Sequence, residues 1–382
     1  MNILCFALWG SSFGLAVFGT LYARRSMRRG QPLAAYQTPA ITIIKPLCGA
    51  DPDLFANLES FFQLDYPVYQ IIFCMESREL NKFASLIFPL MARYPHVDTR
   101  CAASSETLCQ NPKISNAMRA YPHAKHECVL ISDSNVCVER NYLREVVSHH
   151  TPWTGVVTSP VVGVDARSFG ARLEAAYLNT YMLRGIWLMK ALGVPFVLGK
   201  SMLLRKADLE EFGGLPEIGR FLNEDYKTGV RVREIGMSVE VAAQPVHQVL
   251  GKVSFKSYWQ RHLRWSRICK AEGWHAFIID PLTRPVVACS LGAIALSHWN
   301  KCPLAFNFLD LLLLWLSCDL FMVSSVAQEF SIIAWLVGEL IALPLWIYTA
   351  CGNSVQWRGK KIRLRRGCEI DNQAPLEVIR AS

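Results

Sequence analysis

The sequence predicts an α/β fold, with a mostly parallel sheet covered by helices on both faces and with membrane helices at both ends of the chain. Three observations support this prediction: the ends are apolar, the central region has an ordinary soluble composition, and short apolar runs alternate there with helical patterns. Of the 382 residues, 52% are hydrophobic, which is high for a protein without a membrane component.

The N-terminal segment has the length and flanks of a retained membrane anchor. Residues 3–23 read ILCFALWGSSFGLAVFGTLYA and carry no charge. At about 1.5 Å per residue they are long enough to cross a bilayer core of about 30 Å. The basic run RRSMRRG follows this segment, whereas a cleaved signal peptide carries its basic residues first. We therefore predict an anchor with a basic flank over residues 1–36 and a cytoplasmic domain after it.

Residues 37–280 are predicted to form the α/β domain. Continuous apolar runs bounded by turn residues indicate buried strands, and the stretches between them have helical spacing. Such sheets bind ligands at the carboxyl ends of their strands. No G-x-G-x-x-G or Walker A sequence is present, which argues against dinucleotide oxidoreductases and NTPases. The predicted strands are 41–47, 69–75, 127–133 and 154–160, and the predicted helices are 54–64, 83–94 and 142–150.

Residues 281–356 are predicted to hold the C-terminal membrane segments. Their apolar stretches cover about 285–296, 305–326 and 332–351. The first is short for a crossing, and the last is long enough for a full span. The middle one contains Asp310 and Asp319, whose carboxylates should face other helices or water because charge is costly in lipid.

A second basic cluster, WRGKKIRLRRG, opens the tail at 357–382. If both basic clusters are cytoplasmic, the number of crossings between them is even. We therefore predict two full spans and one partial, re-entrant or interfacial insertion in the C-terminal region.

Charge and cysteine content set broader limits. The net charge of +9 suits anionic lipid, a phosphorylated ligand or nucleic acid equally well. The 13 cysteines are scattered without C-x-x-C pairs or zinc-ligand spacing, which favours buried thiols in a reducing compartment.

Asp133 is the first candidate functional residue. It ends a predicted strand and is followed by Ser134 and Asn135. Oxygen ligands of this kind suit Mg²⁺ or Mn²⁺ bridging a diphosphate. The same residues also favour a turn or a helix N-cap, and their spacing alone does not choose between the two interpretations.

Three further candidates precede predicted helices or lie in them. Glu224 and Asp225 open a helix, where acids commonly cap the N-terminus. Arg261 and Arg264 share a helix face and can clamp a diphosphate, although the same helix with its tryptophans also suits an anionic membrane surface. Lys113 follows a proline at a helix start and is a possible anion contact.

The order of these motifs resembles that of the ceramide glucosyltransferase family, which includes bacterial hopanoid-linked relatives. The resemblance extends from about Ile41 to Arg366 and rests on the ordered combination. The matching pieces are ITIIKPLCGADPDL, LDYP, NPKI, SDSN, GKSMLLR, EDY, RHLRW and WRGKKIRLR.

The resemblance implies a GT-A type, Rossmann-like catalytic domain that transfers a sugar with inversion, usually from UDP-glucose, to a lipid hydroxyl. It implies that Asp133 holds the divalent metal and the diphosphate, and that Asp225 is the general base. Arg261, Arg264 and Trp265 would serve the diphosphate and the acceptor mouth, and Lys113 would contact the donor.

The implied partners are a UDP-sugar donor, a lipid acceptor and the bilayer, with no nucleic acid. The implied location is an integral, multi-pass protein with its catalytic domain on the cytoplasmic face of a bacterial inner membrane or of the Golgi or endoplasmic reticulum. The oligomeric state is not predicted.

One position departs from the family pattern. The family's first acidic motif places an Asp beside the uridine, whereas the matching stretch here is MESRELN, with Ser77 at that position. Glu76 is the nearest acid that can take its place as a donor contact, although the period-two alternation of a strand points it the other way. Glu79 follows two residues later.

Three other functions remain open from the sequence. The chain can be a glycosyltransferase that acts on a hopanoid polyol and uses an N-acetylhexosamine donor. A processive polysaccharide synthase shares similar motifs but usually needs more membrane helices. A catalytically inactive, lipid-binding membrane protein is consistent with the missing first Asp.

Overall fold

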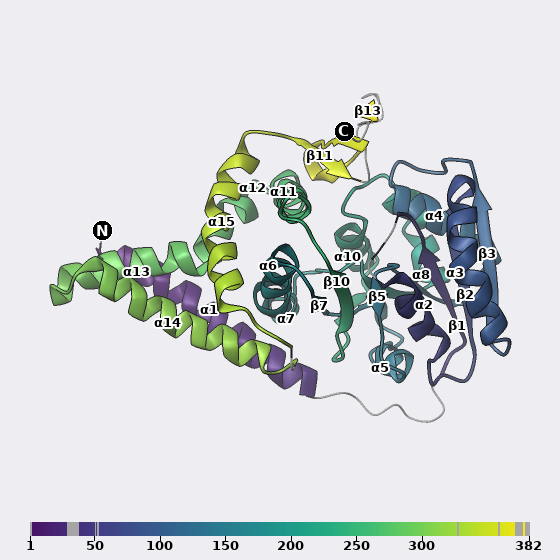
Figure 1. Cartoon of the computed structure of the whole chain (residues 1–382), viewed down its shortest axis with the longest axis horizontal. Helices are drawn as coiled ribbons and strands as arrows, with labels where there is room; N and C mark the ends of the chain where they lie inside the picture. Colours follow the sequence, from purple (N-terminus) through teal and green to yellow (C-terminus); the bar gives the residue numbers. More distant parts are fainter. Residues whose placement is uncertain are drawn as a thin grey trace. The chain divides into compact units, whose positions relative to one another are not determined.

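The computed structural model describes residues 2–28, 38–49, 51, 53–326, 328–357, 360–370 and 377–378. Parts of both basic clusters and most of residues 371–382 lie outside this set. The chain divides into a sheet unit, residues 26–162 and 189–251, and a helical unit, residues 1–25, 163–188 and 252–382 (Figure 1). Residues 163–188 and 252–280, which the sequence analysis assigns to the α/β domain, therefore group with the apolar terminal helices.

The sheet unit is built on seven strands in the order β3-β2-β1-β4-β8-β6-β9. Its strands are parallel to their neighbours except β8, which is antiparallel to both β4 and β6. The predicted mostly parallel sheet is thus confirmed. The strands are β1 (Ile41–Pro46), β2 (Tyr69–Glu76), β3 (Asp98–Ser104), β4 (Cys128–Ser132), β6 (Thr154–Thr158), β8 (Ser201–Arg205) and β9 (Ser238–Val241).

Helices cover both faces of this sheet, as the continuous apolar strands require. On one face, Ile72 and Cys74 pack in a cluster with Ile114 and other residues of the helices that follow. Phe73 points the opposite way and stacks on Phe62 at a ring separation of 6.0 Å. This alternation follows from the period of two in a strand.

The helices of the sheet unit lie between its strands in the chain. They are α2 (Leu54–Phe62), η1 (Ser77–Glu79), α3 (Leu80–Arg93), α4 (Pro112–Ala120), η2 (Tyr121–His123), α5 (Tyr142–Ser148), α8 (Lys206–Glu211), α9 (Gly214–Ile218) and α10 (Glu224–Glu234). A short strand, β5 (Val136–Cys137), pairs antiparallel with β10 (Val246–Gly251).

The helical unit contains the apolar helices and the C-terminal strands. Its elements are α1 (Asn2–Arg28), α6 (Phe169–Tyr177), the π-helix η3 (Leu178–Met182), α11 (Phe255–Glu272), α12 (Trp274–Ile279), η4 (Asp280–Thr283), α13 (Pro285–Asn300), α14 (Leu304–Val323), α15 (Ile332–Ala350), β11 (Ser354–Trp357), β12 (Lys360–Arg363), η5 (Arg366–Cys368) and β13 (Glu377–Val378). The strand β7 (Val161–Ala166) leads into this unit, and α7 (Leu183–Ala191) leads out of it.

Three helices of the described residues are long and apolar enough to cross a membrane: α1, α14 and α15. The segment from Trp274 to Thr283 and α13 also reach this length together, but they meet at a bend of 65°. Within the helical unit, α1, α13 and α14 pack against one another around Trp315 and Cys289.

Of the two acids predicted to avoid lipid on α14, Asp319 is buried. Its carboxylate accepts hydrogen bonds from Arg184 at 2.5 Å and from Trp335 at 2.8 Å. Asp310 instead lies on the exposed surface of α14.

Candidate functional site

The carboxyl ends of β1 and β4 bring together most of the polar residues singled out in the sheet unit. Asp133 follows directly after β4, and Lys45 is the fifth residue of β1. Because β8 runs antiparallel, its first residues lie at this same edge, and Asp133 donates its backbone N–H to the Lys200 carbonyl at 3.1 Å. An antiparallel strand therefore adds Gly199 and Lys200 to the site.

The Asp133 carboxylate is held by two lysines. Its Oδ1 lies 3.0 Å from Lys113 Nζ, and its Oδ2 lies 3.1 Å from Lys200 Nζ. Burial alone would raise the pKa of Asp133, but the two ammonium groups hold it well below the usual range. Asp133 is therefore a firmly ionised carboxylate at the end of a central strand.

Lys113 connects this carboxylate to the start of α10. Its Nζ lies 2.9 Å from Glu224 Oε1 and donates to the Gly199 carbonyl at 2.5 Å. Burial would lower the pKa of Lys113, but the carboxylates of Asp133 and Glu224 raise it above its ordinary value. The NPKI, SDSN, GKS and EDY motifs thus meet at one ammonium group.

The local chain explains why Lys113 lies here. Asn111 caps α4, and its Oδ1 accepts from the backbone N–H of Lys113 at 3.0 Å. The Asn111 amide also donates to Glu224 Oε2 at 3.0 Å. Asn111 therefore caps the helix that carries Lys113 and also positions Glu224, the acid with which Lys113 pairs.

Asp225 lies beside this network and is only partly buried. Its Oδ2 accepts from the Gly199 backbone N–H at 2.8 Å, and its Oδ1 accepts from the Tyr226 N–H at 2.9 Å. Burial, and next the adjacent Glu224 carboxylate, raise the pKa of Asp225 to about 6. A carboxylate with this pKa is suited to accept a proton near neutral pH.

Gly199 packs closely against two side chains of the site. A Cβ on this residue would lie 3.0 Å from Asp225 Oδ2 and 3.0 Å from Lys113 Nζ. A side chain at this position would therefore require the ends of the Asp225 and Lys113 side chains to move by a few tenths of an ångström.

Sequence reasoning did not single out Lys45 or Lys200. Lys45 is fully buried, donates to the Asp133 carbonyl at 2.7 Å and lies 3.6 Å from the ring centre of Phe61. Burial lowers the pKa of Lys45 to about 7. The signal available in the sequence was a lysine inside an otherwise apolar strand, ITIIKPL. For Lys200, the signal was its place in the GKS motif.

The residues at this edge fit a divalent cation by donor type. Asp133 supplies carboxylate oxygens, and Asn135 supplies an amide oxygen that accepts from Lys200 at 2.9 Å. In the part of the chain that the structure describes, no group of three His, Cys, Asp or Glu side chains gathers to hold a metal. A cation at Asp133 would therefore need ligands from the diphosphate and would compete with Lys113 and Lys200 for the carboxylate.

The acids of MESRELN lie at the end of β2. Glu76 Oε2 pairs with the exposed Arg78 at 2.6 Å. Glu79 accepts at 3.0 Å from the backbone N–H of Gly49, in the loop after β1, and Ser77 is exposed. Glu79 thus stabilises the loop after β1 through Gly49, whereas Glu76 forms an ion pair with Arg78.

The R-x-x-R-W residues belong to α11 in the helical unit. Arg261 lies 3.0 Å from Glu174 Oε1 of α6, and Glu174 is fully buried. The Trp265 ring stacks on Tyr177 of α6 with ring centres 5.7 Å apart. Arg264 is half-buried on the same helix. Glu174, the acid that meets Arg261, was not predicted.

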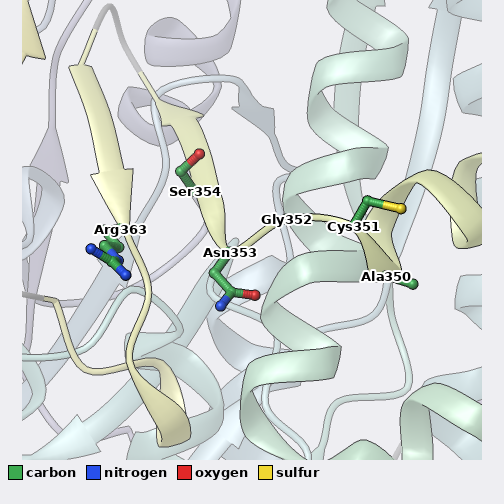
Figure 2. A pocket seen from close by; sticks show the side chains of 6 residues that line it. All are labelled: Ala350, Cys351, Gly352, Asn353, Ser354 and Arg363. Atoms are coloured by element: carbon green, nitrogen blue, oxygen red, sulfur yellow. The ribbon is translucent and has the colours of Figure 1, made fainter.

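A hollow of about 480 Å³ lies in the helical unit where the end of α15 leads into β11 (Figure 2). None of the residues predicted to bind the donor lines it, and its one charged lining residue, Arg363, comes from the second basic cluster. The lining residues are Ala350, Cys351, Gly352, Asn353, Ser354 and Arg363.

The mostly parallel sheet, with acids and lysines at its strand ends, is a GT-A-like arrangement. A model of the family described as glycosyl transferase family 21 matches residues 5–370, and the chain therefore belongs to that family.

Two curated relatives share the name ceramide glucosyltransferase. Ceramide glucosyltransferase 3 of Caenorhabditis elegans is 29% identical over 347 residues, covering 87% of this chain and 74% of the relative. A ceramide glucosyltransferase of Komagataella phaffii is 24% identical over 459 residues, covering 91% and 86%. These proteins are what the chain is similar to along most of its length.

One solved structure supports the fold. A mannosyltransferase from Pyrobaculum calidifontis, solved with GDP-Man and Mn²⁺, aligns with a TM-score of 0.51 at 18% identity. The alignment covers 89% of this chain and 98% of that protein.

Proposed function

We propose that this protein is an inverting glycosyltransferase that moves a sugar, most simply glucose from UDP-glucose, to a hydroxyl of a membrane lipid such as ceramide. The family and the names of its relatives support the class of reaction. The observation that carries the mechanism is the Asp225 carboxylate, held between two backbone N–H groups with its pKa raised to about 6.

The proposed reaction is a direct displacement at the anomeric carbon. The lipid hydroxyl oxygen attacks this carbon, and the bond from the carbon to the diphosphate oxygen breaks. The hydroxyl proton passes to an Asp225 oxygen, and the bonding electrons leave with UDP. Glu224 stays paired with Lys113 and Asn111, so it supports Asp225 without taking the proton.

We propose that Lys113 and Lys200 bind the donor diphosphate and stabilise the charge that develops on UDP. Asp133 would orient the two ammonium groups and hold a Mg²⁺ or Mn²⁺ ion. Such an ion, when bound, supplies further positive charge to the leaving group. The roles of Arg261, Arg264 and Trp265 at the diphosphate and the acceptor mouth rest on the RHLRW motif alone.

The nucleoside contact assigned to Glu76 stays a proposal. It requires the carboxylate to leave Arg78, its partner at 2.6 Å. Ser77 has no charge to offer in place of the family's Asp. We therefore expect recognition of the nucleoside to depend more on the loop after β1, which Glu79 fastens.

A lipid acceptor requires a membrane location. We propose an integral, multi-pass protein with the sheet unit on the cytoplasmic face, because the RRSMRRG cluster directly follows the apolar residues 3–23 of α1. A basic protein surface also suits both a UDP-sugar and anionic lipid.

The function is tested with the purified full chain in lipid vesicles. UDP-glucose and UDP-N-acetylglucosamine are each offered with ceramide and with a hopanoid polyol, and the products are identified by mass. We expect hexosylceramide from UDP-glucose. Transfer only to the hopanoid would keep the reaction class and change the acceptor, and the absence of any glycolipid product would overturn the proposed function.

A further inference from the structure

The apolar helices of the helical unit differ in what they pack against. The helix α1 lies along both α13 and α14 (Figure 1). Side chains of the three helices share one apolar cluster. Near the start of α1, the ring centres of Phe6 and of Trp299 at the end of α13 are 5.1 Å apart. In the middle of α1, Phe13 lies 5.6 Å from Trp315 of α14.

The far end of α1 meets the far end of α14. Arg24 donates to Ser324 at 2.8 Å and lies 3.8 Å from the ring centre of Phe321. The helices α1 and α14 are therefore parallel, and α13 runs antiparallel to both. The turn at 301–303, between α13 and α14, consequently lies at the end of the bundle opposite Arg24.

This arrangement determines which helices cross if α1 crosses. The turn at 301–303 must then lie on the other side of the membrane from Arg24 and Arg25. The helix α13 reaches that side, and α14 returns from it. The 16 residues of α13 extend for about 24 Å, which is short for a bilayer core of about 30 Å, so local thinning or the preceding bent segment must make up the difference.

The helix α15 contacts one end of the bundle formed by α1, α13 and α14. Near its start, Trp335 donates to Asp319, four residues before the end of α14. In its middle, Glu339 lies 3.4 Å from Arg284, the residue that precedes α13. The first half of α15 thus contacts the start of α13 and the end of α14, which lie at the same end of the bundle as Arg24. It does not run parallel to α13 and α14 along their length.

The second half of α15 lies against a charged helix. The ring centres of Trp259 in α11 and Tyr348 in α15 are 6.1 Å apart. Lys270 of α11 donates to the backbone carbonyls of Thr349 and Ala350 at 3.0 and 3.1 Å. A helix as basic as α11 does not enter hydrocarbon. Its neighbour α15 cannot cross the core while keeping these contacts.

The remaining face of α15 is apolar and exposed. At 100° per residue, its exposed aliphatic side chains fall within an arc of about 100°, so α15 turns one apolar stripe outward while its other sides pack within the unit. These residues are Ile332, Ile333, Leu336, Leu340, Leu343 and Ile347.

A neighbouring helix extends this apolar surface. Trp346 of α15 donates to the Phe277 carbonyl of α12 at 2.7 Å, and α12 exposes Trp274, Ile278 and Ile279. Tryptophan is enriched at the level of lipid headgroups.

We propose that α15 lies in the plane of the membrane surface with this stripe in the lipid interface, and that α1, α13 and α14 are the helices that cross. The proposal rests on the membrane location proposed above. It keeps the even number of crossings between the basic clusters but assigns them to α13 and α14. The sequence prediction instead took residues 332–351 as a full span and residues 285–296 as the partial insertion.

The test uses the full chain with one epitope tag at a time in sealed cells, probed with antibody before and after permeabilisation. The tags are placed after Lys301, after Glu329 and at the C-terminus. We expect the tags after Glu329 and at the C-terminus on one side and the tag after Lys301 on the other. A tag after Glu329 on the opposite side from the C-terminal tag would overturn the proposal, because α15 would then cross.

The same tags separate this inference from the proposed function. If the tag after Lys301 is cytoplasmic and the other two are external, the inference stands and the proposed cytoplasmic face is wrong. A matched pair of substitutions gives a second measurement that needs no insertion. Leu313 of α14 and Leu340 of α15 are 51% and 53% exposed.

We expect Leu313→Lys to lower the amount of protein in the membrane several-fold, because a lysine at the centre of a crossing helix is costly. Leu340→Lys should change it by less than about twofold, because a side chain at the interface can reach water. Equal losses for the two variants, or a larger loss for Leu340→Lys, would contradict an in-plane α15.

Discussion

At the scale of single residues, the site is an alternation of charges. Lys113 lies between Asp133 and Glu224, and Lys200 meets the other oxygen of Asp133. Asp225 is adjacent to Glu224 but takes its own hydrogen bonds from two backbone N–H groups. The two acids of the EDY motif therefore differ. The negative charge of Glu224 is paired with Lys113, whereas Asp225 is available to accept a proton.

The pH dependence of transfer tests this difference. Asp225 must be ionised to accept a proton, so kcat/KM of the wild-type protein should rise with pH through about 6, where its raised pKa lies. Glu224→Gln removes a negative neighbour and lowers the pKa of Asp225, so the acid limb should move to lower pH. An unmoved limb, or one moved to higher pH, would contradict the coupling of the two acids.

Binding of UDP tests the lysines. Lys200→Met should weaken UDP binding, measured by calorimetry with the full chain, by about tenfold or more, because a charge-assisted hydrogen bond is worth about 1.5–3 kcal/mol. Lys190→Met is the matched control: Lys190 also belongs to the sheet unit and pairs with Glu240 at 2.7 Å. Equal affinity of the two variants would remove Lys200 from the diphosphate site.

At the scale of elements, α11 and α6 are joined by a buried charge pair. Glu174 has no exposed surface, and Arg261 and His262 approach it from α11. Burial would raise the pKa of Glu174, but Arg261 and His262 hold it at about 2. The RHLRW motif therefore helps to hold α11 against α6 in the helical unit, independently of any role in donor binding.

Thermal unfolding in detergent separates these roles. Arg261→Met leaves the buried Glu174 with His262 at 3.4 Å but without its arginine partner. This should cost about 2–3 kcal/mol, below the roughly 3–5 kcal/mol of a fully buried pair because the Arg261 side chain is 28% exposed. The double variant Arg261→Met/Glu174→Gln should recover most of this loss.

Transfer activity gives the second readout. If Arg261 also binds diphosphate, the double variant stays impaired in transfer although its stability recovers. A double variant less stable than Arg261→Met alone would contradict the pairing of Arg261 with Glu174.

The strands of the sheet unit show what the sequence could and could not predict. Continuous apolar runs identified β1, β2, β4 and β6, and the strand-end rule placed Asp133 at the edge of the sheet where the candidate site lies. The reversed direction of β8 was not predictable, because residue alternation is the same in parallel and antiparallel strands. With it, the contribution of Lys200 was missed.

Lys45 and Glu174 were missed for a related reason. A buried charge is stabilised by groups far away in the chain, here Asp133 and Arg261, so its local sequence gives no sign of the pairing. The motif order, by contrast, gave Asp225 its proposed role before any geometry was known. The acids at 76 and 79 were distinguished only by their contacts with Arg78 and Gly49.

At the scale of the whole molecule, the first helix is packed into the helical unit. Gly19 lies so close to α7 that an added Cβ would be 2.8 Å from Arg184 Cγ. Arg184 in turn pairs with Asp319 of α14 at 2.5 Å. Segments from three distant parts of the sequence therefore meet in one packed region.

A pair of glycine substitutions on α1 tests this packing. Gly19→Leu should lower the melting temperature of the purified protein by several degrees, because the side chain would displace Arg184. Gly14→Leu should have little effect, because nothing lies within 4 Å of a Cβ at that position. Equal melting temperatures for the two variants would mean that α1 serves only as an anchor.

The most direct test of the central claim is the rate of glycolipid formation by Asp225→Asn, measured by product mass with UDP binding as the control. The account predicts a loss of about 10²–10⁴-fold in transfer with UDP binding retained, because the base is removed and the lysines that bind the diphosphate are kept. Transfer at the wild-type rate would contradict the assignment of Asp225 as the base.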